Sequence, residues 1–229
     1  MFLLSIDTST MRGSVALIDE KGAMDFINQD NESNHTDWLL KHIDILLKRN
    51  SLQTADLNGI AVAKGPGSFT GLRIGLATAK GLSLALNIPL IGISSLEAFA
   101  YNSIDRSGFI APLIDARRSQ LFAAVYKIEE RKLNVVMEEG VFDPDELLTR
   151  LIAIKSEILL VGDGVVRYRS TFEKEPSLII DENMLYSNAS GLGLIALERL
   201  KSGAPSELVT LKPNYIRKSD AKIKSVCSI

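Results

Sequence analysis

The glycine-rich stretch KGPGSFTGLRIG, residues 64–75, has the residue types that most suggest chemistry. It holds four glycines and one proline, and it follows the apolar run IAVA at 60–63. A strand, a glycine-rich turn and a helix present backbone N–H groups to a phosphate in many proteins. The stretch therefore raises two hypotheses, nucleotide binding and close backbone packing.

The spacing of the glycines excludes the two best-known phosphate loops. A P-loop requires lysine and a hydroxyl residue after its last glycine, but Leu72 and Arg73 follow Gly71. A dinucleotide fingerprint requires G-x-G-x-x-G. Gly65 and Gly67 fit that pattern, whereas Thr70 stands where the third glycine belongs. The stretch is a loop of another kind.

The segment SIDTST is the second candidate for chemistry. Its Asp7 ends an apolar run and is followed by Thr8 and Ser9. Actin-like and sugar-kinase folds place such an acid near phosphate and metal, but normally with a glycine after it for close backbone approach. The alternative is that these three side chains hydrogen-bond their own turn. The candidate nucleotide-binding residues are Asp7, Thr8, Ser9, Gly65 and Gly67.

Other reactive residues form no recognisable catalytic or metal-binding set. The only histidines, His35 and His42, lie seven residues apart, whereas helical metal pairs are usually spaced by four. No serine has the context of a nucleophile elbow. Asp115 and Asp163 each follow a strand-like run, and we interpret both as structural. The sequence assigns no catalytic residue and no metal ligand.

Composition and charge favour an ordinary globular protein. The chain has 229 residues, of which 46% are hydrophobic. Its formal net charge is −2, so its overall charge gives no electrostatic attraction to nucleic acid. Its basic tail, with Arg217, Lys218, Lys222 and Lys224, leaves tRNA contact open as a hypothesis. The single cysteine, Cys227, excludes an internal disulfide. With no signal-peptide pattern and no run of 18 apolar residues, we expect a cytoplasmic protein without membrane contact.

The pattern of elements predicts two α/β lobes. Strand-like runs at 2–7, 13–19 and 22–28 precede a helix at 36–49, a strand at 57–63 and a helix at 70–86. After residue 102 three strands and alternating helices and strands occur again. We therefore predict mixed sheets flanked by helices, with lobes at 1–104 and 105–229, the last helix and tail being free to pack back on the first lobe.

The two helices of the first lobe are unusually apolar. Between residues 70 and 86 the only charges are Arg73 and Lys80, and small residues recur every four positions. Such a helix is either buried by its own lobe or packed against another protein, because small residues allow close backbone approach. We propose both helices as a partner interface, formed by His35, Trp38, Leu39, His42, Ile45, Leu46, Gly71, Leu72, Arg73, Gly75, Leu76, Ala79 and Lys80.

These motifs resemble those of one known family. The glycine stretch after IAVA, IDTST at the start, NHTDWLLKHID at 34–44 and KPNYIRK at 212–218 together resemble the TsaB (YeaZ) family. The resemblance covers nearly the whole chain and implies an actin-like (ribonuclease H-like) fold. It also implies a paralogue of the catalytic subunit TsaD, in which two histidines of the first helix bind a metal. Here the matching pair is His35 and Leu39, so the site is broken.

The resemblance implies a non-catalytic subunit that supports transfer of a threonylcarbamoyl group to the adenosine beside the tRNA anticodon. Its expected partners are TsaD, the ATPase subunit TsaE, a second copy of itself when isolated, and tRNA indirectly. No cofactor is required by the chain, although ATP is possible in the assembly. The alternatives are a weak nucleotide-binding ATPase or kinase relative and an inactive glycoprotease-like metallopeptidase homologue.

Overall fold

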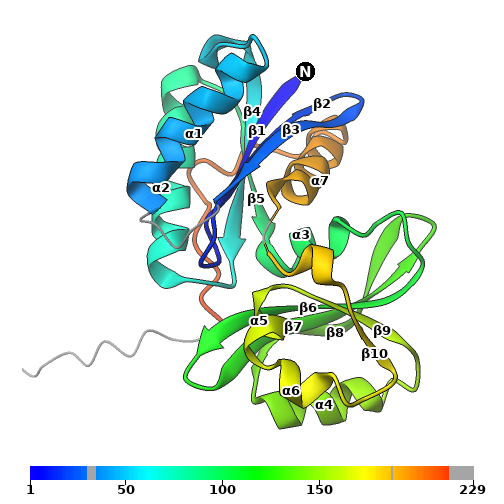
Figure 1. Cartoon of the computed structure of the whole chain (residues 1–229). Coiled ribbons are helices and arrows are strands. Elements are labelled where there is room, and N and C mark those ends of the chain that lie inside the picture. The colour runs from blue at the N-terminus through cyan, green and yellow to red at the C-terminus, as the bar shows by residue number, and fades with distance from the viewer. Residues whose placement is uncertain (30–34, 187, 217–229) are drawn as a thin grey trace, which may run out of the picture.

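The computed structural model describes residues 1–29, 35–186 and 188–216, and of residues 35–37 the backbone only. Within this part the chain forms two lobes, each built on a five-stranded mixed sheet (Figure 1). The first sheet has the order β3-β2-β1-β4-β5. Its strands are β1 (Phe2–Asp7), β2 (Ser14–Asp19), β3 (Gly22–Asn28), β4 (Leu57–Gly65) and β5 (Leu90–Ser94).

The second sheet repeats the topology of the first. Its order is β10-β9-β6-β7-β8, so an antiparallel meander of three strands is again extended by two parallel strands on the side of its first strand. The predicted architecture of two similar lobes is therefore confirmed. The strands are β6 (Gly108–Arg117), β7 (Gln120–Glu129), β8 (Lys132–Phe142), β9 (Ile158–Val161) and β10 (Leu178–Ile180).

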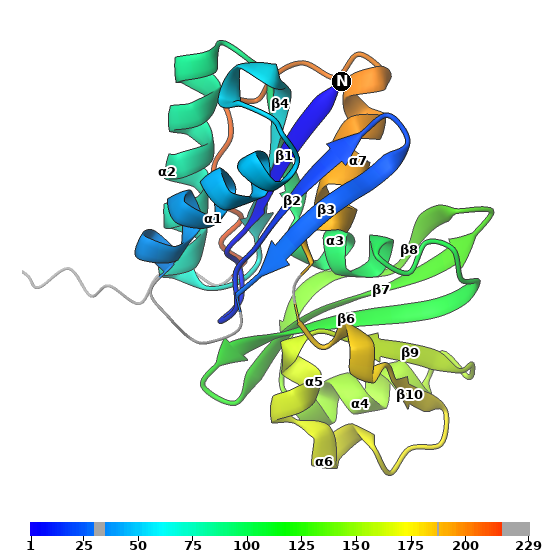
Figure 2. The same cartoon turned by 45° about the horizontal axis from the view of Figure 1, so that its top comes forward.

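Helices cover both faces of the first sheet because its strands alternate two sets of buried side chains. Leu4 and Ile6 of β1 face α1 (His35–Arg49) and α2 (Phe69–Leu86), whereas Leu3 faces the opposite layer. That layer contains α3 (Ser95–Tyr101) and α7 (Ala189–Lys201) (Figure 2). A short 3-10 helix, η1 (Thr54–Asp56), leads into β4.

The second lobe has its helices on the side away from the first lobe. These are α4 (Pro144–Ile152), α5 (Asp163–Arg167) and α6 (Arg169–Phe172). The 3-10 helix η2 (Glu182–Met184) follows β10, and its Met184 packs against the cluster that α3 forms with the second sheet. The sequence indicates only a glycine-rich turn where α5 lies. The other face of the sheet packs on α3, whose Leu96 and Phe99 contact the second-lobe cluster that includes Ile114 and Phe122. The helix α3 therefore lies between the two sheets.

The end of the chain returns to the first lobe. The helix α7 packs on that lobe's sheet, where Ser5 Oγ donates a hydrogen bond to Ala189 O at 2.7 Å. Farther along, Leu211 is buried in the first-lobe core, and Asn214 N donates to Lys64 O at 2.6 Å. The first lobe thus contains residues 189–216 as well as the N-terminal elements. Among the described residues, none of the helices combines the length and the apolar composition that a membrane span requires.

Candidate functional site

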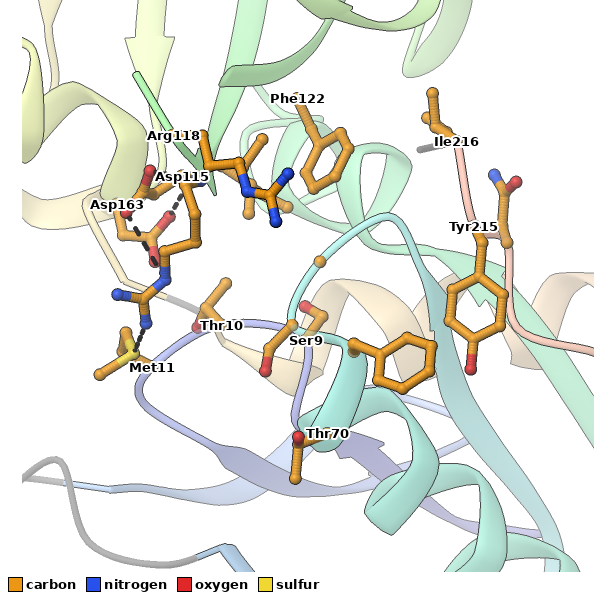
Figure 3. A pocket seen from close by; sticks show the side chains of 17 residues that line it. Ser9, Thr10, Met11, Thr70, Asp115, Arg118, Phe122, Asp163, Tyr215 and Ile216 are labelled. Carbon is orange, nitrogen blue, oxygen red and sulfur yellow. Dashed lines mark hydrogen bonds and ion pairs between the residues drawn. The ribbon is translucent and has the colours of Figure 1, made fainter. Parts of the chain in front are cut away.

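A cavity of about 360 Å³ lies in the cleft between the lobes (Figure 3). Its walls come from the turn after β1, the start of α2, the β6–β7 hairpin, the start of α5 and the segment that ends at Ile216. These parts are far apart in sequence and meet in the folded chain. The lining residues are Ser9, Thr10, Met11, Gly67, Ser68, Phe69, Thr70, Ile114, Asp115, Ala116, Arg117, Arg118, Phe122, Asp163, Asn214, Tyr215 and Ile216.

The first-lobe wall is held by hydrogen bonds of the turn after β1. Asp7 Oδ1 accepts from Ser9 N at 2.8 Å, and Thr8 Oγ1 donates to Gly71 O at 2.7 Å. Ser9 O accepts from Ser68 N at 2.7 Å, which joins this turn to the loop before α2. The bond of Asp7 lies within its own turn, as the structural alternative predicts, whereas the Thr8 hydroxyl joins the turn to α2.

Only two of the five candidate nucleotide-binding residues line the cavity. These are Ser9 and Gly67, whereas Asp7, Thr8 and Gly65 lie outside its lining. Ser9 is fully buried, and its Oγ has no hydrogen-bond partner among the described residues. A buried hydroxyl without a partner costs about 1–3 kcal/mol, so Ser9 is an unusual feature of this wall.

The glycines of residues 64–75 permit close approach of two backbones. A Cβ at Gly67 would lie 2.2 Å from Ser9 O, and one at Gly71 would lie 2.0 Å from Thr8 O. Both distances are far inside van der Waals contact, so no larger residue fits without moving the backbone. The close-packing hypothesis therefore accounts for these two glycines.

Charged residues of both signs form the second-lobe wall. Asp115 follows the buried part of β6, and its Oδ1 accepts from Arg117 N at 2.9 Å. Arg167 Nε lies 3.7 Å from Asp115 Oδ2. Asp163, at the start of α5, accepts from Asp115 N at 3.2 Å. Burial, reinforced by the negative charges of Asp115 and Asp7, raises the pKa of Asp163 to about 6.

An aromatic cluster borders the cavity beside the start of α2. The rings of Phe69 and Tyr215 lie 5.0 Å apart between centroids. The guanidinium of Arg73 lies 3.7 Å from the centroid of Phe69, and its Nε donates to Tyr215 Oη at 3.2 Å. These contacts hold the C-terminal segment against the start of α2 beside the cavity.

The small-residue stripe of α2 faces the interior of its own lobe. A Cβ at Gly75 would lie 2.3 Å from Thr8 Oγ1, so a larger residue there would clash with Thr8. Ala79 is fully buried. The prediction that Gly71 and Gly75 belong to a partner interface is therefore wrong, because the neighbour that approaches them is the turn after β1. Also buried among the proposed interface residues are Trp38, Leu39, Leu46, Leu72 and Leu76.

The remaining proposed interface residues differ in exposure. Ile45 and Arg73 are exposed, and His42 is partly buried, stacked on Trp38 with ring centroids 4.5 Å apart. Lys80 is also partly buried and donates from Nζ to Leu211 O at 2.9 Å. His35 begins α1, but its side chain lies outside the described residues, as does the basic tail.

The outward face of α1 and α2 carries exposed apolar residues, most of which were not part of the predicted interface. Leu84 is 72% exposed and Leu40 is 58% exposed. The second set of small residues, at Ala77, Gly81 and Ala85, is exposed as well, and nothing lies within 4 Å of a Cβ built at Gly81. We call Leu40, Ile45, Ala77, Gly81, Leu84 and Ala85 the outer helix face.

Sequence reasoning missed the part of the cleft that comes from the second lobe and the tail. In the sequence, Asp115 and Asp163 each look structural when taken alone. The structure brings both to one cavity with Arg117 and Arg118. The doubled topology was a signal, because Asp115 lies near the end of β6 and Asp7 ends β1, the corresponding strand of the first lobe. Among the described residues, no group of three His, Cys, Asp or Glu side chains could hold a metal ion.

Comparison with known proteins identifies the family. The sequence pattern of TsaD, tRNA N6-adenosine threonylcarbamoyltransferase, matches residues 27–225. The TsaB protein of tRNA threonylcarbamoyladenosine biosynthesis from Escherichia coli is 30% identical over 224 residues, which cover 96% of each chain. The chain belongs to the TsaB (YeaZ) family.

Solved structures agree with this assignment. YeaZ from Pseudomonas aeruginosa superposes with a TM-score of 0.79 at 27% identity, covering 93% of this chain and 99% of that one. Component A of the (R)-2-hydroxyglutaryl-CoA dehydratase of Acidaminococcus fermentans has a TM-score of 0.56 at 9% identity, covering 88% and 99%. The second likeness concerns the fold alone, and it agrees with the predicted two-lobed α/β architecture.

Proposed function

We propose that this TsaB-family chain is a non-catalytic subunit in the biosynthesis of threonylcarbamoyladenosine on tRNA, where it binds and supports its catalytic paralogue TsaD. The name of the Escherichia coli relative and the match to the TsaD pattern support the pathway. In this proposal TsaE is a further subunit of the same assembly, ATP is used by the assembly, and tRNA is contacted indirectly. Self-association of the isolated chain would use the same surface.

The outer helix face is the observation that carries the partner role. Leu84 alone is 72% exposed, and the neighbouring small residues on α2 leave its backbone open to a second helix. Exposed apolar patches mark protein–protein interaction sites on many proteins, and we propose that the outer helix face is one. The helices α1 and α2 lie side by side on one side of the first lobe, so together they offer a broad surface (Figure 1).

A charge placed on the outer helix face tests this proposal. In Leu84→Asp a carboxylate would be desolvated in the interface, and we expect at least a tenfold loss of affinity for purified TsaD, about 1.4 kcal/mol. Ile152→Asp is the matched control, because Ile152 is also exposed (42%) and also lies in the last turn of a helix, α4 of the second lobe. Isothermal titration calorimetry gives the affinity, and thermal unfolding reports whether each variant is folded.

Two results would contradict the partner role. One is unchanged affinity in Leu84→Asp. The other is an equal loss in Ile152→Asp, since that loss would reflect added negative charge rather than a contact on the first lobe. Nucleotide binding through Asp7 and Thr8 has less support, because Asp7 bonds within its own turn, Thr8 bonds to Gly71 of α2, and both residues lie outside the cavity lining.

A further inference from the structure

We propose that Glu139 of the second lobe is a pH-sensitive latch that holds the two lobes together where β5 of the first lobe passes into α3. This inference is independent of the partner role. It rests on the contacts that one partly buried carboxylate on β8 makes with two separate elements of the first lobe.

Ser94 makes the first of these contacts. It ends β5 and caps α3, since its Oγ accepts from Glu97 N at 3.2 Å. The same hydroxyl donates to Glu139 Oε1, which joins the first lobe to the second (Figure 1). Hinges between domains are usually a few residues at the ends of elements, so a bond at Ser94 acts where the lobes would turn relative to one another.

The C-terminal segment supplies the second contact. Asn214 Nδ2 donates to Glu139 Oε2 at 3.3 Å, and Asn214 N donates to Lys64 O of β4 at 2.6 Å. Two residues later, Ile216 packs on the apolar cluster that α3 forms with the second sheet. The segment therefore passes from the first-lobe core, where Leu211 is buried, to the second lobe, and Glu139 is its polar anchor there.

The charges around Glu139 decide how its carboxyl group titrates. The ionisable groups that act on it or line the same groove are Glu97 of α3, Lys64 of β4, Tyr126 of β7 and Glu138 of β8. Glu97 is also paired with Arg199 of α7 at 2.9 Å. Burial is the largest influence and raises the pKa of Glu139, more than the bond from Ser94 lowers it. The negative charge of Glu97 adds to the rise in this pKa, whereas Lys64 and Tyr126 oppose it.

The raised pKa makes the latch stronger in acid. In an opened form the carboxyl group would lie in water with its ordinary pKa of 4.5, so the latched form binds the proton more tightly. The protonated group can donate to Ser94 Oγ and accept from Asn214 with its other oxygen, so both contacts persist. The latched form is therefore favoured most below pH 4.5, and this advantage is lost as the pH rises through the raised pKa.

The distance between the lobes, measured by double electron–electron resonance on the full-length chain, tests this proposal. Spin labels at Lys41→Cys and Lys174→Cys occupy exposed sites, one on α1 and one just after α6, and Cys227→Ser removes the native thiol. We expect a single distance at pH 4.5 and a several-fold larger share of a second distance at pH 7.5.

Two substitutions of Glu139 separate the latch from other titrating groups. Glutamine does not ionise but keeps an acceptor and a donor, so Glu139→Gln should show the single distance at both pH values. Glu139→Ala removes two hydrogen bonds between the lobes, so the share of the second distance should rise at least about tenfold at pH 4.5. Glu138→Gln is the matched control and should respond to pH as the wild type does, because Glu138 is the exposed neighbour on the same strand.

Three results would overturn the proposal. The first is a wild-type distance distribution that is the same at both pH values, and the second is a Glu139→Ala distribution equal to that of the wild type. The third is a full pH response in Glu139→Gln, which would assign the response to another carboxyl group such as Asp163. Thermal unfolding reports whether each variant is folded, and Glu139→Gln keeps the test decisive if Glu139→Ala is not.

Discussion

The substitution Asp163→Asn should stabilise the protein at neutral pH. The carboxyl group is partly buried at the start of α5, and burial together with Asp115 and Asp7 raises its pKa from 3.8 to about 6. Each pKa unit corresponds to 1.36 kcal/mol, so ionisation of Asp163 costs the folded state about 3 kcal/mol. Asparagine is neutral, and its Oδ1 can still accept from Asp115 N.

The sign of this effect sets its pH dependence. A raised carboxyl pKa means that the folded state binds the proton more tightly than the unfolded state. The cost is therefore absent below pH 4, grows as the pH rises toward 6 and is complete above that value. We expect urea unfolding to show a gain of about 3 kcal/mol for Asp163→Asn at pH 7.5 and a much smaller gain at pH 4.5.

A matched control distinguishes this mechanism from a general effect of removing a carboxylate. Asp44 is exposed and pairs with Lys48 one helical turn away, so Asp44→Asn should change the free energy of unfolding by less than about 0.5 kcal/mol at either pH. A loss of stability in Asp163→Asn at pH 7.5, or a gain that is the same at both pH values, would refute the reasoning.

Two further predictions concern packing in the first lobe, and thermal or urea unfolding measures both. Gly75→Ala should cost more than about 2 kcal/mol because its Cβ would lie 2.3 Å from Thr8 Oγ1, whereas Gly81→Ala, in open space on the same helix, should gain about 0.5–1 kcal/mol. Equal effects at the two glycines would contradict this account of the helix. Leu211→Ala should cost about 2–5 kcal/mol, since Leu211 fills the space over Gly92 in the first-lobe core; a cost below 1 kcal/mol would mean that the C-terminal segment is not part of that core.

The strands and long helices could be predicted because their pattern is local. Apolar runs bounded by turn residues indicated β1, β2 and β3, and a long run of small and apolar residues without proline indicated α2. The recurrence of the same order of elements after residue 102 gave the two lobes. Each of these inferences uses neighbours within about twenty residues, where the physical causes of secondary structure act.

The faces and the cleft could not be predicted because they depend on distant neighbours. The spacing of Gly71, Gly75 and Ala79 shows that something lies close to α2, but it does not say that Thr8, more than sixty residues earlier, is that neighbour. The cavity likewise joins Ser9, Arg118 and Tyr215, which no local pattern connects. The exposed stripe at Ala77, Gly81 and Ala85 has the same spacing as the buried one, so the sequence alone does not show which stripe is buried.

Formation of threonylcarbamoyladenosine in a reconstituted reaction tests the central claim most directly. The reaction contains tRNA, ATP, threonine, bicarbonate, TsaD and the other proteins of the assembly, with this chain present, absent or replaced by Leu84→Asp. We predict modified adenosine only with the wild-type chain, much less with Leu84→Asp, and no ATP turnover by the chain alone. Equal modification in its absence would contradict the proposed role.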